Sequence, residues 1–398
     1  MSEGAIAWVL ISSALVLFMT PGLALFYGGM VRAKNVLNML MKNFFTIAIV
    51  TVVWSIVGYS LAFGTDIGGI VGGLDFIGLK GVEGDALLFM VFQMMFAIIT
   101  PALISGAVAE RMKFSAWVLF TTLWAAFIYP VIAHWAFAPD GWLFAWGVRD
   151  FAGGLVVHIN AGIAALALVQ ALGPRKGFGV AQMRPHSLPL TLLGTGILWL
   201  GWFGFNAGSA LAADGIAINA FVTTQIAAAA ATMTWVVAEW RKTGKPSLLG
   251  AACGAVAGLV AITPAAGFVS PLPAMVIGGA AGVICFAAVN LKTRLGYDDS
   301  LDVVGVHLVG GIVGSVLLGV FAQNSVNEAV PDGLLFGGAA FFAKQVVAVL
   351  AVMATSYVAS FVLARIVGRL VGLRVDETQE DEGLDISLHH ERGYALVE

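Results

Sequence analysis

The stretch DFAGGLVVHINAGIAAL, residues 150–166, decides how the whole chain is interpreted. Its body is apolar enough for the hydrocarbon of a membrane, yet His158 lies in its middle. Ionisable side chains inside membrane helices are rare, and they usually face an interior path. A single histidine of this kind fits a hydrogen-bonded packing residue as well as a functional one, so the rest of the chain has to separate the two.

The composition excludes a soluble globule. Of the 398 residues, 60% are hydrophobic and only 11% are charged, whereas a soluble domain has about 25% charged residues. The chain is therefore predicted to be an all-α integral membrane protein, because helices satisfy their own backbone in lipid. Cys253 and Cys285 both lie in apolar runs, which fits small core hydrophobes and implies no disulfide framework.

The apolar runs predict eleven transmembrane helices. Each run is long enough to cross about 30 Å of hydrocarbon, and the runs do not alternate as barrel strands would. They fall at 5–31, 43–63, 86–108, 114–133, 151–172, 187–210, 216–238, 247–267, 272–291, 302–322 and 337–367.

Lysine and arginine set the predicted orientation. With the N-terminus outside, every Lys and Arg except Lys80, Arg149 and Lys344 lies in a cytoplasmic segment, as the positive-inside rule requires. An odd number of helices places the C-terminus inside. We therefore expect a transmembrane domain over 1–370 and a cytoplasmic tail over 371–398, which fits either a solvated tail or a regulatory, partner-binding segment.

A second stretch, DVVGVHLVGGIVG at 302–314, echoes the first. Each has an aspartate at its start, a histidine inside, and a glycine four residues after the histidine, namely Gly162 and Gly311. The stretches open the fifth and tenth runs, and five helices per half predict inverted repeats with the functional site near the midplane. This correspondence favours a functional role for His158 and His307.

The depth of the histidines points to a neutral path. His158 lies eight residues past Asp150, which is about 12 Å into the membrane. No HExxH, CxxC or carboxylate cluster accompanies the pair, so a metal site is not expected. A bare ion in an apolar path costs tens of kcal/mol. The cargo is therefore expected to be a small neutral molecule, or a cation that sheds its proton.

Two aromatic stripes accompany the histidines. LWLGWFGFNAGSA at 198–210 places Trp202, Phe205 and Ser209 on one helical face, and VFQMMF at 91–96 places Phe92 and Phe96 four residues apart. Such stripes are more often core than site. The order is what favours a path, with a hydroxyl at the outer mouth, rings below it and histidines deeper. Aromatic faces attract small cations.

Asp150 stands at the start of the fifth run, where a carboxylate favours a helix N-terminus. A structural role is therefore expected for it rather than a role as a substrate ligand.

At these residues the sequence resembles the ammonium transporter family, in its bacterial or archaeal branch. The resemblance covers nearly the whole chain. It is carried by PGLALFYGGMVRAKN (21–35), GAVAERMKFSA (106–116), DFAGGLVVHINAG (150–162), GWFGFNAGSA (201–210), GKPSLLGAACGAVAGLVAITPAAG (244–267), DVVGVHLVGGIVG (302–314) and VGLRVDETQEDEGLDIS (371–387).

The resemblance implies a homotrimer of eleven-helix subunits, each with its own pore. It makes His158 and His307 the paired pore histidines, and Phe96 and Phe205 the stacked phenyl gate. It also implies that the tail docks on a PII-family signalling protein at the cytoplasmic face of the cytoplasmic membrane. No cofactor, enzymatic activity or nucleic-acid partner is expected.

The resemblance further implies that Phe92 and Ser209 recruit ammonium at the outer vestibule. Trp202 would line the pore, and Asp150 would stand at the mouth of the fifth helix. The loop AHWAFAPDGWLFAWGVRD (133–150) departs from the family, because Phe137 stands where a vestibule tryptophan is usual. Trp142, Trp146 or a ring from a neighbouring subunit are the alternatives for completing the aromatic cage.

The predicted function is transport of ammonium, or ammonia and methylammonium, across the cytoplasmic membrane. Ammonium would be recruited outside, deprotonated near the phenyl gate and conducted as ammonia past the histidines. Three rival functions remain: an Rh-like neutral gas channel, an ammonium sensor that signals through a partner, and an intramembrane hydrolase. A hydrolase would need a nucleophile or metal set at matched depth, and the sequence offers neither.

Overall fold

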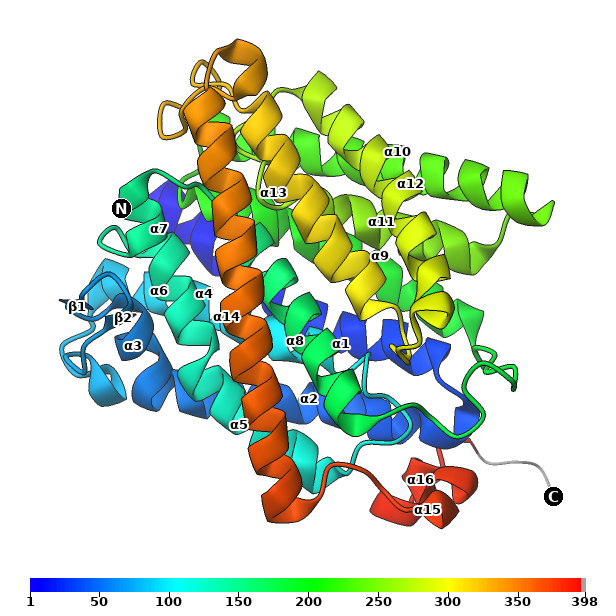
Figure 1. The fold of residues 1–398 in the computed structure, drawn as a ribbon. Helices are drawn as coiled ribbons and strands as arrows, with labels where there is room; N and C mark the ends of the chain where they lie inside the picture. The colour runs from blue at the N-terminus through cyan, green and yellow to red at the C-terminus, as the bar shows by residue number, and fades with distance from the viewer. Residues whose placement is uncertain (395–398) are drawn as a thin grey trace.

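A computed structural model describes residues 1–394 and shows a bundle of long helices with the N-terminus and the C-terminal segment at opposite ends (Figure 1). Within the described residues the one sheet is a hairpin of β1 (Asp66–Ile67) and β2 (Val71–Gly72). The helices are α1 Glu3–Met30, α2 Val36–Val53, α3 Tyr59–Phe63, α4 Gly84–Ile104, α5 Phe114–Phe127, α6 Tyr129–Phe137, α7 Trp142–Trp146, α8 Asn160–Leu172, α9 Leu188–Asn206, α10 Gly215–Thr243, α11 Leu248–Ile262, α12 Pro271–Leu295, α13 Val309–Phe321, α14 Ala339–Val371, α15 Glu377–Glu382 and α16 Leu384–His389.

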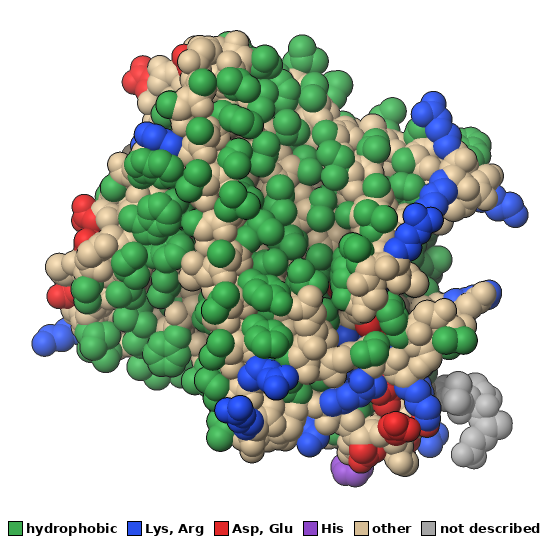
Figure 2. Space-filling view, viewed as in Figure 1, with side chains coloured by type: hydrophobic (Ala, Val, Ile, Leu, Met, Phe, Trp, Pro, Cys, Tyr) green, Lys and Arg blue, Asp and Glu red, His purple; other side chains and the backbone are tan. Residues whose placement is uncertain are grey.

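Each of the eleven predicted apolar runs contains a helix. Among the described residues, ten helical segments are long and apolar enough to cross a membrane, and α11 is a shorter apolar helix of 15 residues. Pro264 follows two residues after its end, and it lacks the N–H that would continue the helical hydrogen bonds. Apolar side chains cover most of the face seen in Figure 2, as a lipid-facing surface requires.

The second run begins earlier than its apolar residues predict. The helix α2 starts at Val36, before Lys42, whereas the run begins at residue 43. Lys42 is fully buried, and its Nζ donates to the Met112 carbonyl 3.1 Å away. A lysine whose ammonium group is hydrogen-bonded by a neighbouring loop can lie within a membrane helix. Lys42 therefore does not mark the start of α2.

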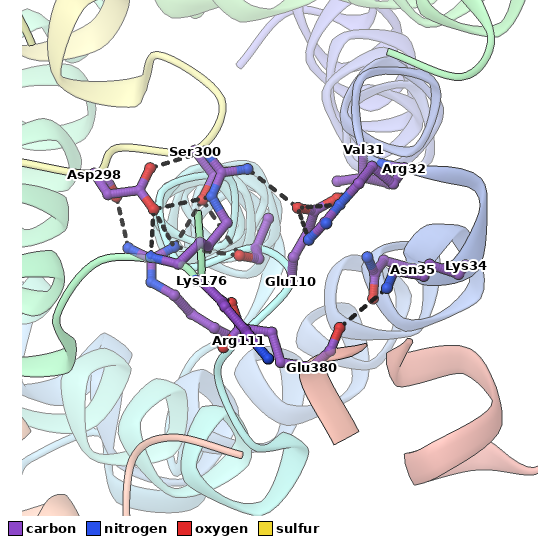
Figure 3. Close-up of polar contacts among 12 residues, drawn as sticks. Val31, Arg32, Lys34, Asn35, Glu110, Arg111, Lys176, Asp298, Ser300 and Glu380 are labelled. Carbon is purple, nitrogen blue, oxygen red and sulfur yellow. Dashed lines mark hydrogen bonds and ion pairs between the residues drawn. The ribbon is translucent and has the colours of Figure 1, made fainter. Parts of the chain in front are cut away.

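Loops at the end of the bundle where the C-terminal segment lies are joined by a buried network of charges (Figure 3). Arg175 binds Asp298 at 2.8 Å and Glu110 at 3.2 Å, and Arg32 binds the same Glu110 oxygen at 2.8 Å. Burial alone would raise the pKa of the Glu110 carboxyl, but the hydrogen bonds and charges of Arg32 and Arg175 lower it below its usual value. Four separate loops are therefore held together by paired, ionised groups.

The C-terminal segment packs against the same loops after α14 ends at Val371. A Glu380 carboxylate oxygen accepts the Lys176 backbone N–H at 2.6 Å, and its backbone carbonyl accepts from Lys34 Nζ at 3.2 Å (Figure 3). Asp385 accepts the first N–H groups of α2, those of Leu37 and Asn38. Residues 371–394 are thus docked on the bundle, and residues 395–398 of the predicted tail lie outside the described residues.

Candidate functional site: a buried histidine pair below an aromatic vestibule

His158 and His307 lie against each other, although they are 149 residues apart in the sequence. Their Nδ1 atoms are 3.3 Å apart, and their ring centroids are 5.4 Å apart with an interplanar angle of 21°. Both side chains are buried. A hydrogen bond between two Nδ1 atoms requires one of them to carry a proton and the other to offer a lone pair. The two imidazoles are therefore placed to share one proton between their Nδ1 atoms.

Each histidine lies in a π-helical turn that precedes a regular helix. His158 belongs to η4 (Gly154–Ile159), before α8, and His307 belongs to η6 (Val304–Leu308), before α13. Such turns are rare in proteins, and where they occur they often lie at functional sites. The two histidines therefore have the same local backbone setting, each within the widened turn that leads into its helix.

Glycines allow the two histidine segments to cross closely. A Cβ added at Gly162 would lie 2.4 Å from the backbone nitrogen of Leu308, and one added at Gly311 would lie 2.8 Å from Ile159. Each glycine thus packs against the residue that follows the opposite histidine. The crossing has the same form from either side, and the glycine spacing noted in the sequence serves close packing.

Asp150 holds the start of the first histidine segment. Its two carboxylate oxygens accept the backbone N–H groups of residues 153–156 at 2.6–3.2 Å. These are the donors that a helix N-terminus leaves without partners. The structural role expected for Asp150 therefore agrees with its contacts, and Asp150 also lines the vestibule described below.

The matching aspartate of the second segment is Asp299 and not Asp302, the residue with which the echo begins. Asp299 accepts the Val304 N–H at 2.7 Å and stands eight residues before its histidine, as Asp150 does. Asp302 instead has a positive φ of 63° and pairs with Lys292. The sequence pattern was misleading because three aspartates follow one another closely in this loop.

A narrow apolar cavity of about 10 Å³ adjoins the histidines. Trp202 lines it, stacks on His158 with centroids 5.4 Å apart, and donates its Nε1–H to the Thr263 hydroxyl. His158 Nε2 has no hydrogen-bond partner among residues 1–394. A space of this size admits about one small molecule, and that molecule would meet a free imidazole nitrogen.

Two buried phenyl rings separate this cavity from a larger space. Phe205 lines the cavity, Phe96 lines the larger space, and their centroids are 4.3 Å apart at 38°. Phe92 contacts Phe96 edge-on at 4.9 Å. The Phe96–Phe205 pair therefore stands between the two spaces.

The larger space, called the vestibule here, has a volume of about 410 Å³. Its walls include all five residues expected at the mouth and the upper gate: Phe92, Phe96, Phe137, Asp150 and Ser209. Phe137 therefore occupies the position expected for an aromatic wall. Trp142 and Trp146 are not among the vestibule-lining residues in the described part of the chain; they stack on each other, and Trp142 also contacts Trp135.

Sequence reasoning missed three polar residues of the vestibule, Gln93, Arg149 and Asn327. Gln93 carried a usable signal, because it is a polar side chain inside a spanning run beside Phe92. Arg149 was visible as a basic residue on the side opposite to most others. Asn327 had no signal, since it lies in a loop far along the chain.

Comparisons with known proteins agree with this geometry. The family model described as Ammonium Transporter Family matches residues 7–394. The chain belongs to the ammonium transporter family. It is 48% identical over 394 residues to "Ammonium transporter Amt1" of Archaeoglobus fulgidus, covering 99% of this chain and 100% of that protein.

Two solved structures have the same fold. Mep2 of Candida albicans matches with a TM-score of 0.90 and 34% identity, covering 95% of this chain and 88% of that one. A structure titled "Sensor Amt Protein" matches with a TM-score of 0.90 at 28% identity, covering 97% of this chain and 98% of that one. This ammonium transporter family member is therefore an all-helical, multi-pass membrane protein.

Proposed function

We propose that the protein carries ammonium from the vestibule across the membrane and passes it as ammonia along the histidine pair. The observation that carries the proposal is the continuous order of the site. The vestibule ends at Phe96, the Phe96–Phe205 pair closes it, and Phe205 borders the cavity that holds both histidines. Family membership identifies ammonium as the cargo.

The chemistry follows from the change in surroundings along this route. In the vestibule, the faces of Phe92 and Phe137 and the Ser209 hydroxyl hold a cation. Below the phenyl pair the walls are apolar, and a bare ion there would cost tens of kcal/mol. Ammonium therefore loses its proton at the gate, and ammonia forms hydrogen bonds with His158 and His307 as it passes.

The proton has two possible fates. It passes along the hydrogen-bonded imidazoles, which makes transport electrogenic, or it stays outside, as in an Rh-like gas channel. The contact between the two Nδ1 atoms supports the first alternative, because a neutral gas needs no such relay. The sensor alternative is less favoured, since the relative titled a transporter is 48% identical and the structure titled a sensor is 28% identical.

The finer architecture is also a proposal. The reciprocal packing of Gly162 and Gly311 supports inverted five-helix repeats, and α11 would complete eleven spanning helices. The distribution of Lys and Arg supports an N-terminus outside, a C-terminus inside and a place in the cytoplasmic membrane. The vestibule then opens outward.

The quaternary proposals rest on the resemblance to the family. We propose a homotrimer in which each subunit has its own pore, and a regulatory segment over 371–398 that engages a PII-family protein. Residues 371–394 are docked on the basic loops that hold Lys34 and Lys176. This contact supports a regulatory segment at the inner face, where a partner protein could bind it. The protein is proposed to act without catalysing a covalent reaction. Native mass spectrometry of the purified protein would measure the number of subunits.

Electrical current on a solid-supported membrane tests the transport mechanism. Reconstituted protein should give a saturable inward current after an ammonium pulse, and His158→Ala and His307→Ala should abolish it. His390→Ala, in the exposed C-terminal segment, is the matched control and should keep the current. Undiminished current in both pore variants would refute the proton relay, and alkalinisation by ammonia without current would favour the gas channel.

A further inference from the structure

We propose that Gln93 is a direct ligand of ammonium, acting as a second hydrogen-bond acceptor beside Ser209 in the vestibule. The inference deepens the proposed function and rests on it. Gln93 belongs to α4, next to Phe92 and three residues before Phe96, so the same helix supplies the aromatic faces and the amide.

The amide of Gln93 is buried without being satisfied. Its side chain borders the vestibule while the residue is only 8% exposed, and its Oε1 has no hydrogen-bond partner among residues 1–394. A buried acceptor without a partner costs about 1–3 kcal/mol. Rotation of the amide interchanges its oxygen and nitrogen, so the oxygen can face the vestibule and accept an N–H from a bound cation.

Ser209 is also restricted to accepting. Its hydroxyl donates to the Phe205 carbonyl at 2.8 Å, which uses its only proton. The lone pairs of the hydroxyl oxygen remain, because a hydroxyl has one donor and two acceptor sites. Ser209 and Gln93 therefore present acceptors, and ammonium carries only donors.

Three other polar residues line the vestibule in the described chain, and Asp150 already accepts four backbone N–H groups. Asn327 Oδ1 accepts the Ala329 N–H at 3.0 Å, which leaves its amide nitrogen as the free group. Arg149 has donors only, and it directs them to the carbonyls of Ala329, Phe144 and Val148. Among the neutral and basic polar side chains that line the vestibule in the described chain, Gln93 and Ser209 are the ones that fit a small cation with several N–H groups.

This arrangement predicts discrimination between substrates. Ammonium has four N–H groups and can bond both acceptors while its other two face the rings or water. Methylammonium has three and must also place a methyl group among the same walls. Loss of one acceptor should therefore weaken the binding of ammonium more than the binding of methylammonium. A site built to hydrogen-bond its ligand loses affinity when an N–H group of the ligand is left without a partner.

The test is Gln93→Met, which keeps the length of the side chain and removes the acceptor. In proteoliposome current measurements, the apparent KM for ammonium should rise about tenfold and that for methylammonium about threefold, with the maximal current retained. Gln93→Glu restores an acceptor and should bring the KM for ammonium back to the parent value or below. Gln225→Met is the matched control, because Gln225 accepts from Trp199 outside the vestibule, and its KM should not change.

An unchanged KM in Gln93→Met would overturn the inference while leaving the proposed transport function intact. Equal losses for both substrates with a lower maximal current and no recovery in Gln93→Glu would also overturn it, because they indicate a packing role. A parent protein that carries no ammonium would instead refute the proposed function itself.

Discussion

The cap formed by Asp150 allows a quantitative test of how the site is built. Its carboxylate accepts four N–H groups, those of residues 153–156, at the start of the segment that holds His158. Asp150→Ala leaves all four donors without this partner in a buried place. At about 1 kcal/mol or more for each unpaired donor, the variant should lose roughly 4 kcal/mol of stability.

Two further variants separate the effect of the buried cap from that of an ordinary exposed cap. Asp150→Asn keeps one acceptor oxygen and turns an amide nitrogen toward the other two donors, so it should lose about half as much or somewhat more. Asp214 caps α10 through one N–H, that of Ala217, at an exposed helix start. Asp214→Ala should therefore cost only about 1 kcal/mol.

The assay is heating of the detergent-solubilised protein, followed by size-exclusion chromatography of the fraction that remains monodisperse. The midpoint should fall in the order parent, Asp214→Ala, Asp150→Asn, Asp150→Ala. If Asp150→Ala were no less stable than Asp214→Ala, the four hydrogen bonds would not be holding the histidine segment, and its structural role would be refuted.

Four other predictions follow from the same structure. Gly162→Val should lower the heating midpoint by an overpacking cost of about 1–3 kcal/mol, because its Cβ would meet the backbone of the crossing segment. Arg149→Gln should lower the apparent KM for ammonium about twofold in low-salt current recordings and much less in high salt, whereas Lys344→Gln, outside the vestibule, should not. Asp385→Ala should speed protease cleavage of the C-terminal segment about tenfold, since it removes the cap that docks this segment on α2. Burial raises the pKa of the Asp299 carboxyl to about 6. The protonated carboxyl therefore contributes its full stability below about pH 4, and this contribution is lost as the pH rises through about 6. Asp299→Asn should flatten that part of a stability-versus-pH curve.

Some of the site was readable from the sequence because its information is local. Helical spacing places Phe92 and Phe96 on one face, and it aligns Trp202, Phe205 and Ser209. In the structure these residues line the vestibule and the narrow cavity in the expected order. The roles in gating and recruitment remain proposals for the transport assays.

Other parts depend on contacts between distant segments and were not readable. The aspartate that matches Asp150 is Asp299, because the backbone turn after it presents the Val304 N–H to its carboxylate. Lys42 lies inside a helix because a loop carbonyl of Met112 reaches its Nζ. The loop contact has no local sequence signal. The spacing of eight residues from aspartate to histidine is the same for Asp150 and Asp299, but the nearer Asp302 obscured it.

The sequence by itself determined the class of the molecule. With 60% hydrophobic residues in runs of membrane-spanning length, the chain cannot cover a water-exposed surface, so helices in lipid are the outcome whatever the tertiary details. Only the tertiary structure decided what the buried polar groups do. The Nδ1 contact of His158 with His307 and the unpaired oxygen of Gln93 depend on where a second segment lies, whereas Ser209 donates its proton within its own segment, to the Phe205 carbonyl. Hydrogen bonds are directional and short, so function here is set by ångström-scale placement that hydrophobic patterning does not encode.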